Sequence, residues 1–565
     1  MSNTKNNMQK NPWSWIPSLY FAEGIPYIIV MFVASDMYKT MGIANSTLAF
    51  WTGLLYLPWV IKPLWSPFVD MYSTKRNWIV WMQLGLAVMF FGVSLSLHLP
   101  WWFPMTLFFL WGMAFSSSTH DIAADGFYIL GLNEHDQAFF TGIRSTFYRL
   151  AMIAGLGVLG IITGLIIDRT GLETVSMDVH AVPATEMTIN YDDPGLQISE
   201  TEKLAIEKTG ATAQIKIFPE NIQVPYTSAG NSLDSTNVYF VLSARPTEHI
   251  RMNFGQKKGS QDIVLTTSGI MEFDASNWHV PQMQTIKIKG NISEPAVAQF
   301  DAKAGNVPFG WSVSIAFLGG LFIIFALYHR TALPRPDRDK ELDSDAERES
   351  YVEIFASFFR KEGVIPSILF MLFYRFSEAQ LTKMASPFFL DAREHGGLAL
   401  SLTEKSFAYG TVGLLALVIG GISGGLLASR HGLKKWIWWM ALAINIPNAV
   451  YIYMSYAMPS NLYVINSMIA IEQFGYGFGF TGYMLYMLYV AGQGKHETAH
   501  FALTTGFMAL GMMIPGMMSG WIQEMLGYQH FFIYVMLCTI PSFIALYFIK
   551  INPEFGKKKA EVDQG

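Results

Sequence analysis

Charged side chains inside long apolar stretches are the feature of this sequence with the most chemical meaning. They are Glu23, Lys62, Asp121, Asp125, Arg149, Arg375, Glu378, Lys383 and Glu472. A charged side chain at the centre of a bilayer costs about 2.5–3.5 kcal/mol on insertion scales, so such residues are kept where they face a polar interior and act there. The pattern predicts a membrane protein with a hydrophilic pathway, and solute transport is the first hypothesis.

Two of these carboxylates are four residues apart and therefore share one face of a helix. Their repulsion and their burial both disfavour the doubly ionised state, so the pair could gain and lose a proton. The predicted proton-coupling residues are Asp121, Asp125, Glu23 and, as a relay, His120. The alternative is structural: Asp121 could pair with Arg144 or Arg149 and fasten two helices together.

The basic residues in the apolar stretches could offer positive charge to a substrate carboxylate, and nearby aromatic rings could stack on sugars. The predicted substrate-binding residues are Arg149, Arg375, Glu378, Lys383, Tyr374, Glu472, Tyr27 and Lys62. Two alternatives remain open here. Arg375 and Glu378 are three residues apart and could neutralise each other, and Lys62 could extend to the membrane interface.

The elements that position these residues are predicted to be membrane helices. Half of the chain (51%) is hydrophobic and 14% is charged, whereas a soluble domain has about 25% charged residues. A spanning helix needs roughly 20 largely apolar residues. The twelve predicted spans are 14–37, 47–69, 78–98, 102–130, 138–167, 309–328, 363–388, 405–428, 435–457, 462–491, 500–521 and 530–549.

Two polar segments interrupt this series, so that six helices precede a linker and six follow it. The predicted divisions are 1–168 (helices one to five), 169–307 (a β-rich insertion), 308–328 (helix six), 329–362 (a linker), 363–550 (the C-terminal six-helix bundle) and 551–565 (a tail). The expected fold class is an all-α polytopic membrane protein with two six-helix bundles and a small all-β insertion.

Alternation of apolar and polar residues predicts strands inside the insertion, at 238–244, 249–255, 261–267 and 283–290. The stretch MEFDASNWHVPQMQTIKIKG resembles the end of Calx-β-type sandwich repeats, where a Trp-x-x-Pro-Gln turn precedes the last strand. Here the turn is Trp278, Pro281 and Gln282. The domain could simply pack on the helices, or it could capture a ligand or dock to another envelope protein.

Basic residues in the short loops predict the orientation in the membrane. With twelve helices threaded, most of them fall on the side of both termini, which is then cytoplasmic, and segment 169–307 lies outside. The opposite short loops hold only Lys39, Arg393 and Lys405.

Two loops echo each other at the same end of the predicted bundles. SPFVDMYSTKRNW places Asp70 before Lys75 and Arg76, and GGLLASRHGLKKW contains Arg430 at the matching place. This echo resembles the G-x-L-x-D-R-x-G-R-K loop of the major facilitator superfamily. The resemblance implies two bundles that rock around a cavity lined by helices one, four, seven and ten, and a gating role for these four residues. Anchoring of the topology is the alternative.

Four stretches resemble the AmpG-type muropeptide permeases within that superfamily. YFAEGIPY (20–27), KPLWSPFVD (62–70), the run 116–155 and the region of helices ten and eleven carry the likeness. The resemblance implies proton-coupled import of a cell-wall sugar or muropeptide, of the GlcNAc-anhydroMurNAc type, across a bacterial inner membrane. Related acetyl-CoA transporters keep other substrates open. His120, which replaces a glutamine of the family, and the 139-residue insertion depart from the pattern.

Several classes of function are disfavoured by what the sequence lacks. It has no phosphate-binding loop, metal-ligand cluster or nucleophile elbow, so we expect neither an enzyme nor a bound cofactor. The single cysteine excludes an internal disulfide, and the net charge of −5 argues against a nucleic-acid partner. The expected partners are a small molecule (an amino sugar, muropeptide or oligosaccharide), protons, the lipid bilayer and, through 169–307, a periplasmic protein. Alternatives are import of another oligosaccharide, a peptide or a CoA thioester, and a sensor or scaffold acting through the β domain.

Overall fold

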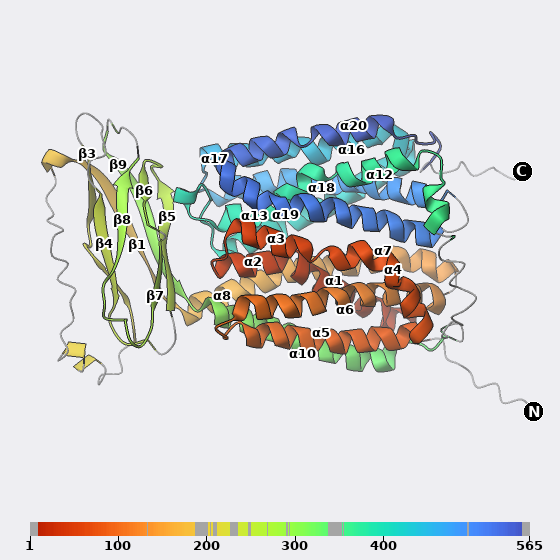
Figure 1. Ribbon diagram of the computed structural model, residues 1–565, viewed down its shortest axis with the longest axis horizontal. Helices are drawn as coiled ribbons and strands as arrows, with labels where there is room; N and C mark the ends of the chain where they lie inside the picture. The colour runs from red at the N-terminus through yellow and green to blue at the C-terminus, as the bar shows by residue number, and fades with distance from the viewer. Residues whose placement is uncertain are drawn as a thin grey trace, which may run out of the picture.

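The protein consists of a long helical body and a β-sandwich at one end of it, as the computed structural model shows (Figure 1). We call this end of the helical body the β-domain end and the opposite one the far end. The structure describes residues 10–555 apart from 133, 187–201, 204, 207–211, 227–234, 247–249, 268, 290, 291, 293, 337, 338, 340–352, 354 and 494–496.

The N-terminal half of the chain forms the lower part of the helical body in Figure 1. Its helices are α1 (Ile16–Ile28), α2 (Ala34–Thr40), α3 (Asn45–Leu54), α4 (Leu57–Tyr72), α5 (Lys75–Ser96), α6 (Trp102–Gly131), α7 (Glu134–Ile153), α8 (Gly160–Thr170) and α10 (Val307–Ala332). Short π-helical segments, Ile29–Val33 and Ala154–Leu159, join α1 to α2 and α7 to α8. Each of these pairs therefore forms one long rod.

The C-terminal half forms the upper part of the body. Its helices are α12 (Val364–Phe373), α13 (Phe376–Leu390), α14 (Leu402–Phe407), α15 (Leu414–His431), α16 (Leu433–Asn445), α17 (Ala449–Ala457), α18 (Leu462–Ala491), α19 (Glu497–Leu537) and α20 (Ile540–Phe548). A π-helical segment, Ala408–Gly413, joins α14 to α15. Helix α19 reverses at Gly527, whose φ of +69° suits a residue without a side chain.

Several of the helical rods are long and apolar enough to cross a membrane. Within the described residues, seven meet this criterion by length and composition: Pro12–Thr40, Lys75–Ser96, Ile143–Thr170, Val307–Ala332, Leu402–His431, Leu433–Ala457 and Ala499–Phe548. The expected class, a helical membrane protein with a β insertion, is confirmed. The count of twelve spans stays a prediction.

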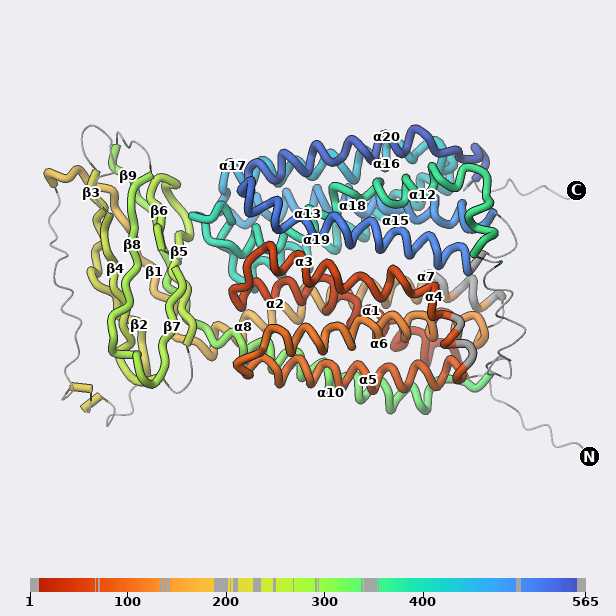
Figure 2. Tube along the Cα trace, viewed as in Figure 1, coloured from red at the N-terminus to blue at the C-terminus, as the bar shows by residue number. Residues whose placement is uncertain are grey.

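The insertion between α8 and α10 is a two-layer β-sandwich (Figure 2). Its strands are β1 (Leu172–Pro183), β2 (Ile215–Phe218), β3 (Ile222–Tyr226), β4 (Thr236–Leu242), β5 (Ile250–Gly259), β6 (Ile263–Leu265), β7 (Ile270–Phe273), β8 (Gln282–Ile288) and β9 (Ala296–Gly305). The sheets have the orders β3-β1-β9-β5-β7 and β2-β4-β8-β6. All four strands expected from alternation are present, as β4, β5, β6 and β8.

Alternate residues of both sheets fill one apolar core in the sandwich. Trp278 of the predicted turn is fully buried in it, and its carbonyl accepts the Leu242 N–H at 3.0 Å. The first strand, β1, pairs antiparallel with the last one, β9. Because β1 follows α8 directly and β9 leads directly into α10, the domain is tied to the N-terminal bundle by two adjacent connections.

The helices of the C-terminal bundle approach closely where glycines remove side chains. A Cβ built on Gly475 or Gly479 of α18 would lie 2.2 or 2.4 Å from a carbonyl oxygen of α16, and one on Gly477 would lie 2.0 Å from the Leu417 carbonyl oxygen of α15. Such distances leave no room for a side chain. These glycines therefore hold α18, which carries Glu472, tightly between α15 and α16.

Candidate functional site

Charged residues on α1, α4 and α6 form one cluster inside the N-terminal bundle. Lys62 of α4 is ion-paired with Asp121 of α6, and both side chains are about four-fifths buried. The carboxyl group of Glu23 on α1 lies near that of Asp121, and its Oε2 is buried without a hydrogen-bond partner among the described residues. Two neighbouring carboxyl groups repel each other when both are ionised, which favours a proton on one of them. This cluster therefore has the parts needed to hold and release a proton.

The partner of Asp121 differs from both candidates named in the structural alternative. Arg144 pairs instead with Asp125, with 3.1 Å between Nη1 and Oδ1. Tyr20 completes this second group, because its hydroxyl donates to Asp125 and accepts from Arg144 at 3.0 Å. The lysine that sequence reasoning allowed to extend to the interface is thus turned into the bundle.

His120 faces away from these carboxylates. Its Nε2 is 3.0 Å from the amide nitrogen of Gln83 on α5, and the Gln83 oxygen is 3.0 Å from Nδ1 of His329 on α10. His329 in turn contacts the Ser18 hydroxyl at 2.9 Å. The imidazole therefore belongs to a buried polar chain that ties four helices together, and its role as a proton relay stays a prediction.

In the C-terminal bundle, Arg375 and Glu378 do neutralise each other. Two hydrogen bonds of 2.7 and 2.6 Å join the guanidinium to the carboxylate, and both side chains are buried. Arg375 also donates to the Tyr476 hydroxyl at 2.9 Å. Tyr374 donates to the Gly479 carbonyl at 3.0 Å and stacks on Tyr483. The Tyr374 hydroxyl is thus engaged inside its own bundle.

Lys383 is a buried cation without a carboxylate partner among the described residues. Its Nζ lies 3.2 Å from the Thr52 hydroxyl and 3.3 Å from the Met31 carbonyl, both of the other bundle, and over the Tyr56 ring. Only 4% of Lys383 is exposed. An ammonium buried in this way can accept an incoming anion as a counter-charge.

The remaining predicted substrate residues lie at other places along the helices. The guanidinium of Arg149 lies close to Gly421 of α15, and no ion pair of Arg149 is seen within the described chain. Glu472 is buried and accepts a 2.9 Å hydrogen bond from the neighbouring Gln473. Tyr27 packs edge-on against Trp59.

The loop-motif residues lie at the far end. The backbone N–H groups of Lys75 and Arg76, which begin α5, donate to Asp339 of the linker at 2.8 and 3.1 Å. This carboxylate therefore caps a helix N-terminus. Arg430 lies in the last turn of α15 and is exposed. The side chain of Asp70 lies outside the described part of the chain.

A contact set that sequence reasoning missed closes the two bundles against each other at the β-domain end. Lys405 of α14 pairs with Asp36 of α2 at 2.5 Å, with 3% of each side chain exposed, and Ser386 also donates to Asp36. Lys39 pairs with Asp391 at 2.5 Å. The available signal was that Asp36 and Lys405 lie at the same predicted membrane depth on helices one and eight.

Comparison with known proteins identifies the class. The sequence profile of the BT1 family matches residues 21–304, half of the chain, and that of the Major Facilitator Superfamily matches residues 304–515. The nucleoside transporter NupG shares the fold with a TM-score of 0.53 and 11% identity, over 97% of this chain and 100% of that one. The D-xylose-proton symporter gives 0.54 and 10%, over 96% and 98%.

Curated relatives narrow the comparison. A candidate transporter, AmpG 2, of Rickettsia prowazekii is 26% identical over 38% of this chain and 50% of its own length. The anhydromuropeptide permease of Escherichia coli is 22% identical over 35% of this chain and 39% of its own. The chain spans about half the length of the curated relatives it matches or less.

The helical body has the fold of major facilitator transporters, and the predicted likeness to AmpG-type permeases is confirmed. The chain belongs to the BT1 family. The expectation that the protein is not an enzyme agrees with these relatives, which are named as a transporter and a permease.

Proposed function

We propose that the protein imports a cell-wall-derived sugar or muropeptide, of the GlcNAc-anhydroMurNAc type, together with protons. Transport proceeds by alternating access across the bacterial inner membrane, with both termini cytoplasmic and the β domain in the periplasm. The likeness to the Escherichia coli anhydromuropeptide permease supports the substrate class. The far-end position of the basic loop residues supports the orientation.

The observation that carries the proton coupling is the position of Asp121 between a cation and a second carboxyl group. Its ion pair with Lys62 stabilises the ionised form, whereas the neighbouring carboxyl group of Glu23 favours a proton on one of the two groups. A small movement of α4 relative to α1 and α6 changes the balance between the two. Proton binding is thereby linked to helix movement.

The substrate is expected to supply the missing counter-charge at the bundle interface. Muropeptides carry carboxylates, and Lys383 and Arg149 are two cations inside the helical body for which we see no carboxylate partner within the described chain. Lys383 already spans the two bundles through Thr52 and Met31. A carboxylate bound at Lys383 would draw its ammonium away from these contacts and so couple binding to bundle separation.

The first test is uptake of labelled GlcNAc-anhydroMurNAc peptide into permease-deficient cells that express the protein, with and without a protonophore. We expect uptake that collapses with the proton gradient. Asp121→Asn should lose accumulation but keep counterflow exchange, because exchange needs no net proton movement. Asp125→Asn, whose partner is Arg144, tests the second predicted coupling carboxylate in the same two assays.

Two results would contradict the proposal. Absence of uptake with the protein present in the membrane would reject the muropeptide substrate. Full accumulation by Asp121→Asn would reject this carboxylate as the coupling site. If, in addition, deletion of 175–303 abolished the cellular phenotype, the sensor or scaffold function would be favoured.

A further inference from the structure

Strand β5 faces the helical body with one row of its side chains. Met252, Phe254 and Gln256 point into the core of the sandwich and are at most 2% exposed. Because successive side chains of a strand alternate between its faces, Arg251 points the other way and Gly255 lies on that same face. Lys257, at the bulge between Gln256 and Lys258, also points towards the helices, where it reaches Glu404. These residues contact the helical body at its β-domain end.

The contact with the N-terminal bundle is made by Arg251. Its Nη1 donates to the Met41 carbonyl, just after α2, at 2.6 Å. The guanidinium also occupies the space beside Gly42, where a Cβ would lie 2.1 Å from Nη2. Together with the two covalent connections to α8 and α10, this contact fixes the sandwich to the N-terminal bundle.

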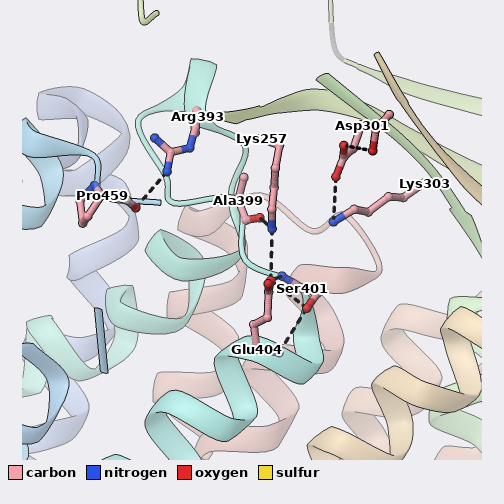
Figure 3. A network of polar contacts seen from close by, with 9 residues as sticks. Lys257, Asp301, Lys303, Arg393, Ala399, Ser401, Glu404 and Pro459 are labelled. Carbon is pink, nitrogen blue, oxygen red and sulfur yellow. Dashed lines mark hydrogen bonds and ion pairs between the residues drawn. The ribbon is translucent and has the colours of Figure 1, made fainter. Parts of the chain in front are cut away.

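The contact with the C-terminal bundle is made by the other end of the row (Figure 3). Lys257 Nζ lies 3.2 Å from Glu404 of α14 and 3.1 Å from the Ala399 carbonyl oxygen. The Gln256 N–H donates to Glu394 at 3.1 Å. Gly255 lies against Ala392, with 3.1 Å between a built Cβ and the Ala392 Cβ.

The receiving loop, 391–401, is held rigidly on the C-terminal bundle. Arg393 donates to the Met458 carbonyl at 2.7 Å and to the Pro459 carbonyl at 2.9 Å, and Figure 3 shows the second contact. Ala399, whose carbonyl accepts from Lys257, has a φ of +55°, an unfavourable value for a residue with a side chain. The loop is therefore shaped to present its acceptors to the strand.

The charges on the two sides of this interface are complementary. The sandwich contributes Lys257 and Lys303, the latter also paired with Asp301 of its own strand at 3.6 Å, and the C-terminal bundle contributes Glu394 and Glu404. Burial lowers the pKa of Lys303, with Lys257 as a further cause, and burial raises the pKa of Glu394. Both groups are thus partly removed from water by the docking.

We propose that the β domain is a latch: it is fixed to the N-terminal bundle and holds the C-terminal bundle through Gly255, Gln256 and Lys257, so that the β-domain end stays closed until these contacts release. Separation of the bundles at this end moves loop 391–401 away from a sandwich that moves with α8 and α10. The inference rests on the alternating-access part of the proposed function, but not on the substrate or the proton.

The test measures separation of the bundles at the β-domain end by spin-label distances. Labels at Trp101→Cys and Tyr463→Cys report the two bundles, since these residues are 75% and 84% exposed at that end, in a Cys538→Ala background. Lys257→Met should raise the open fraction about two- to five-fold, as expected for a partly exposed ion pair. Lys258→Met, a change of the same type on the exposed neighbouring residue, should leave it unchanged.

A second variant locks the latch. The Cβ separation of 3.1 Å between positions 255 and 392 needs only a small shift to reach the 3.5–4.5 Å of a disulfide, so Gly255→Cys with Ala392→Cys should cross-link. Cleavage at a protease site placed in the linker reveals the bond, because both fragments then stay joined until reduction. In the oxidised protein the longer label distance of the open state should disappear, and it should return on reduction. Each single cysteine variant should give the label distances of the wild type.

Failure of the latch and failure of the proposed function are distinguishable. Opening by Lys405→Met, without any effect of Lys257→Met or of the disulfide, would overturn the latch and leave alternating access intact. If no variant showed the longer label distance of an open β-domain end, both alternating access and the latch would be overturned. A failure to transport muropeptide would overturn the proposed substrate but would not bear on the label distances, and so not on the latch.

Discussion

The buried ion pair between Asp36 and Lys405 should set how often the β-domain end opens. Lys405→Met leaves the Asp36 carboxylate with the Ser386 hydroxyl as its remaining described side-chain partner, in a site where 3% of it is exposed. Removing one partner of a buried ion pair costs about 3–5 kcal/mol, because the other charge stays desolvated. In the open state Asp36 regains water, so the cost falls on the closed state alone.

The expected shift follows from that difference. Each 1.4 kcal/mol is tenfold in an equilibrium constant, so the open-to-closed ratio should rise by about two to three and a half powers of ten. The assay is the distance between spin labels at positions 101 and 463. Lys39→Met is the graded control: its pair with Asp391 has 14–15% of each side chain exposed, so a smaller shift is expected.

A double replacement separates the charge from the packing. Asp36→Leu with Lys405→Met removes both charges, and apolar replacement of a buried pair is often neutral or stabilising. This variant should return towards the closed state. An unchanged distance distribution for Lys405→Met, or equal opening by the single and double variants, would refute the reasoning.

Two further predictions concern helix packing and substrate binding. Gly410→Ala should destabilise the closed state by about 1–3 kcal/mol, because its Cβ would lie 2.5 Å from the backbone of Leu156 and Gly157. Gly425→Ala, with nothing within 4 Å, is the control, and equal label distances in both variants would contradict this prediction. Arg149→Met should weaken muropeptide binding by about 1.5–3 kcal/mol, the worth of a hydrogen bond to a charged group. Equilibrium binding to purified protein measures it, with Arg430→Met as a control, and unchanged affinity would exclude Arg149 from the site.

Hydropathy and charge located the helices and the charged residues of the site, because the cost of a charge in lipid is a local property of the sequence. Which cation pairs with each carboxylate, by contrast, depends on how the helices pack and cannot be read from the local sequence. Asp121 pairs with Lys62 rather than with an arginine of helix five, since the rotation of α4 and α7 about their axes decides which cation reaches it. The pairing of Arg375 with Glu378 could be predicted because both lie on one helix face.

In the β domain, too, some features could be predicted from the local sequence and others depend on the fold. Alternation revealed β4, β5, β6 and β8, whereas β1, β2, β3, β7 and β9 were not recognised. Its docking onto the helices could not be predicted, because Arg251 and Lys257 look like ordinary surface cations of a strand. Only the fold brings them opposite Met41 and Glu404.

The order of strands in the sandwich has a consequence for synthesis of the protein. In the larger sheet, β9 lies between β1 and β5, yet it is the last strand of the domain to leave the ribosome. The sheet cannot close until Gly305 has crossed to the side of the membrane on which the domain folds, and α10 begins two residues later, at Val307. Completion of the sandwich and membrane entry of α10 are therefore neighbouring events during translation. A nascent chain paused before β9 would keep the edges of β1 and β5 unpaired, and these edges are open to chaperones or to aggregation.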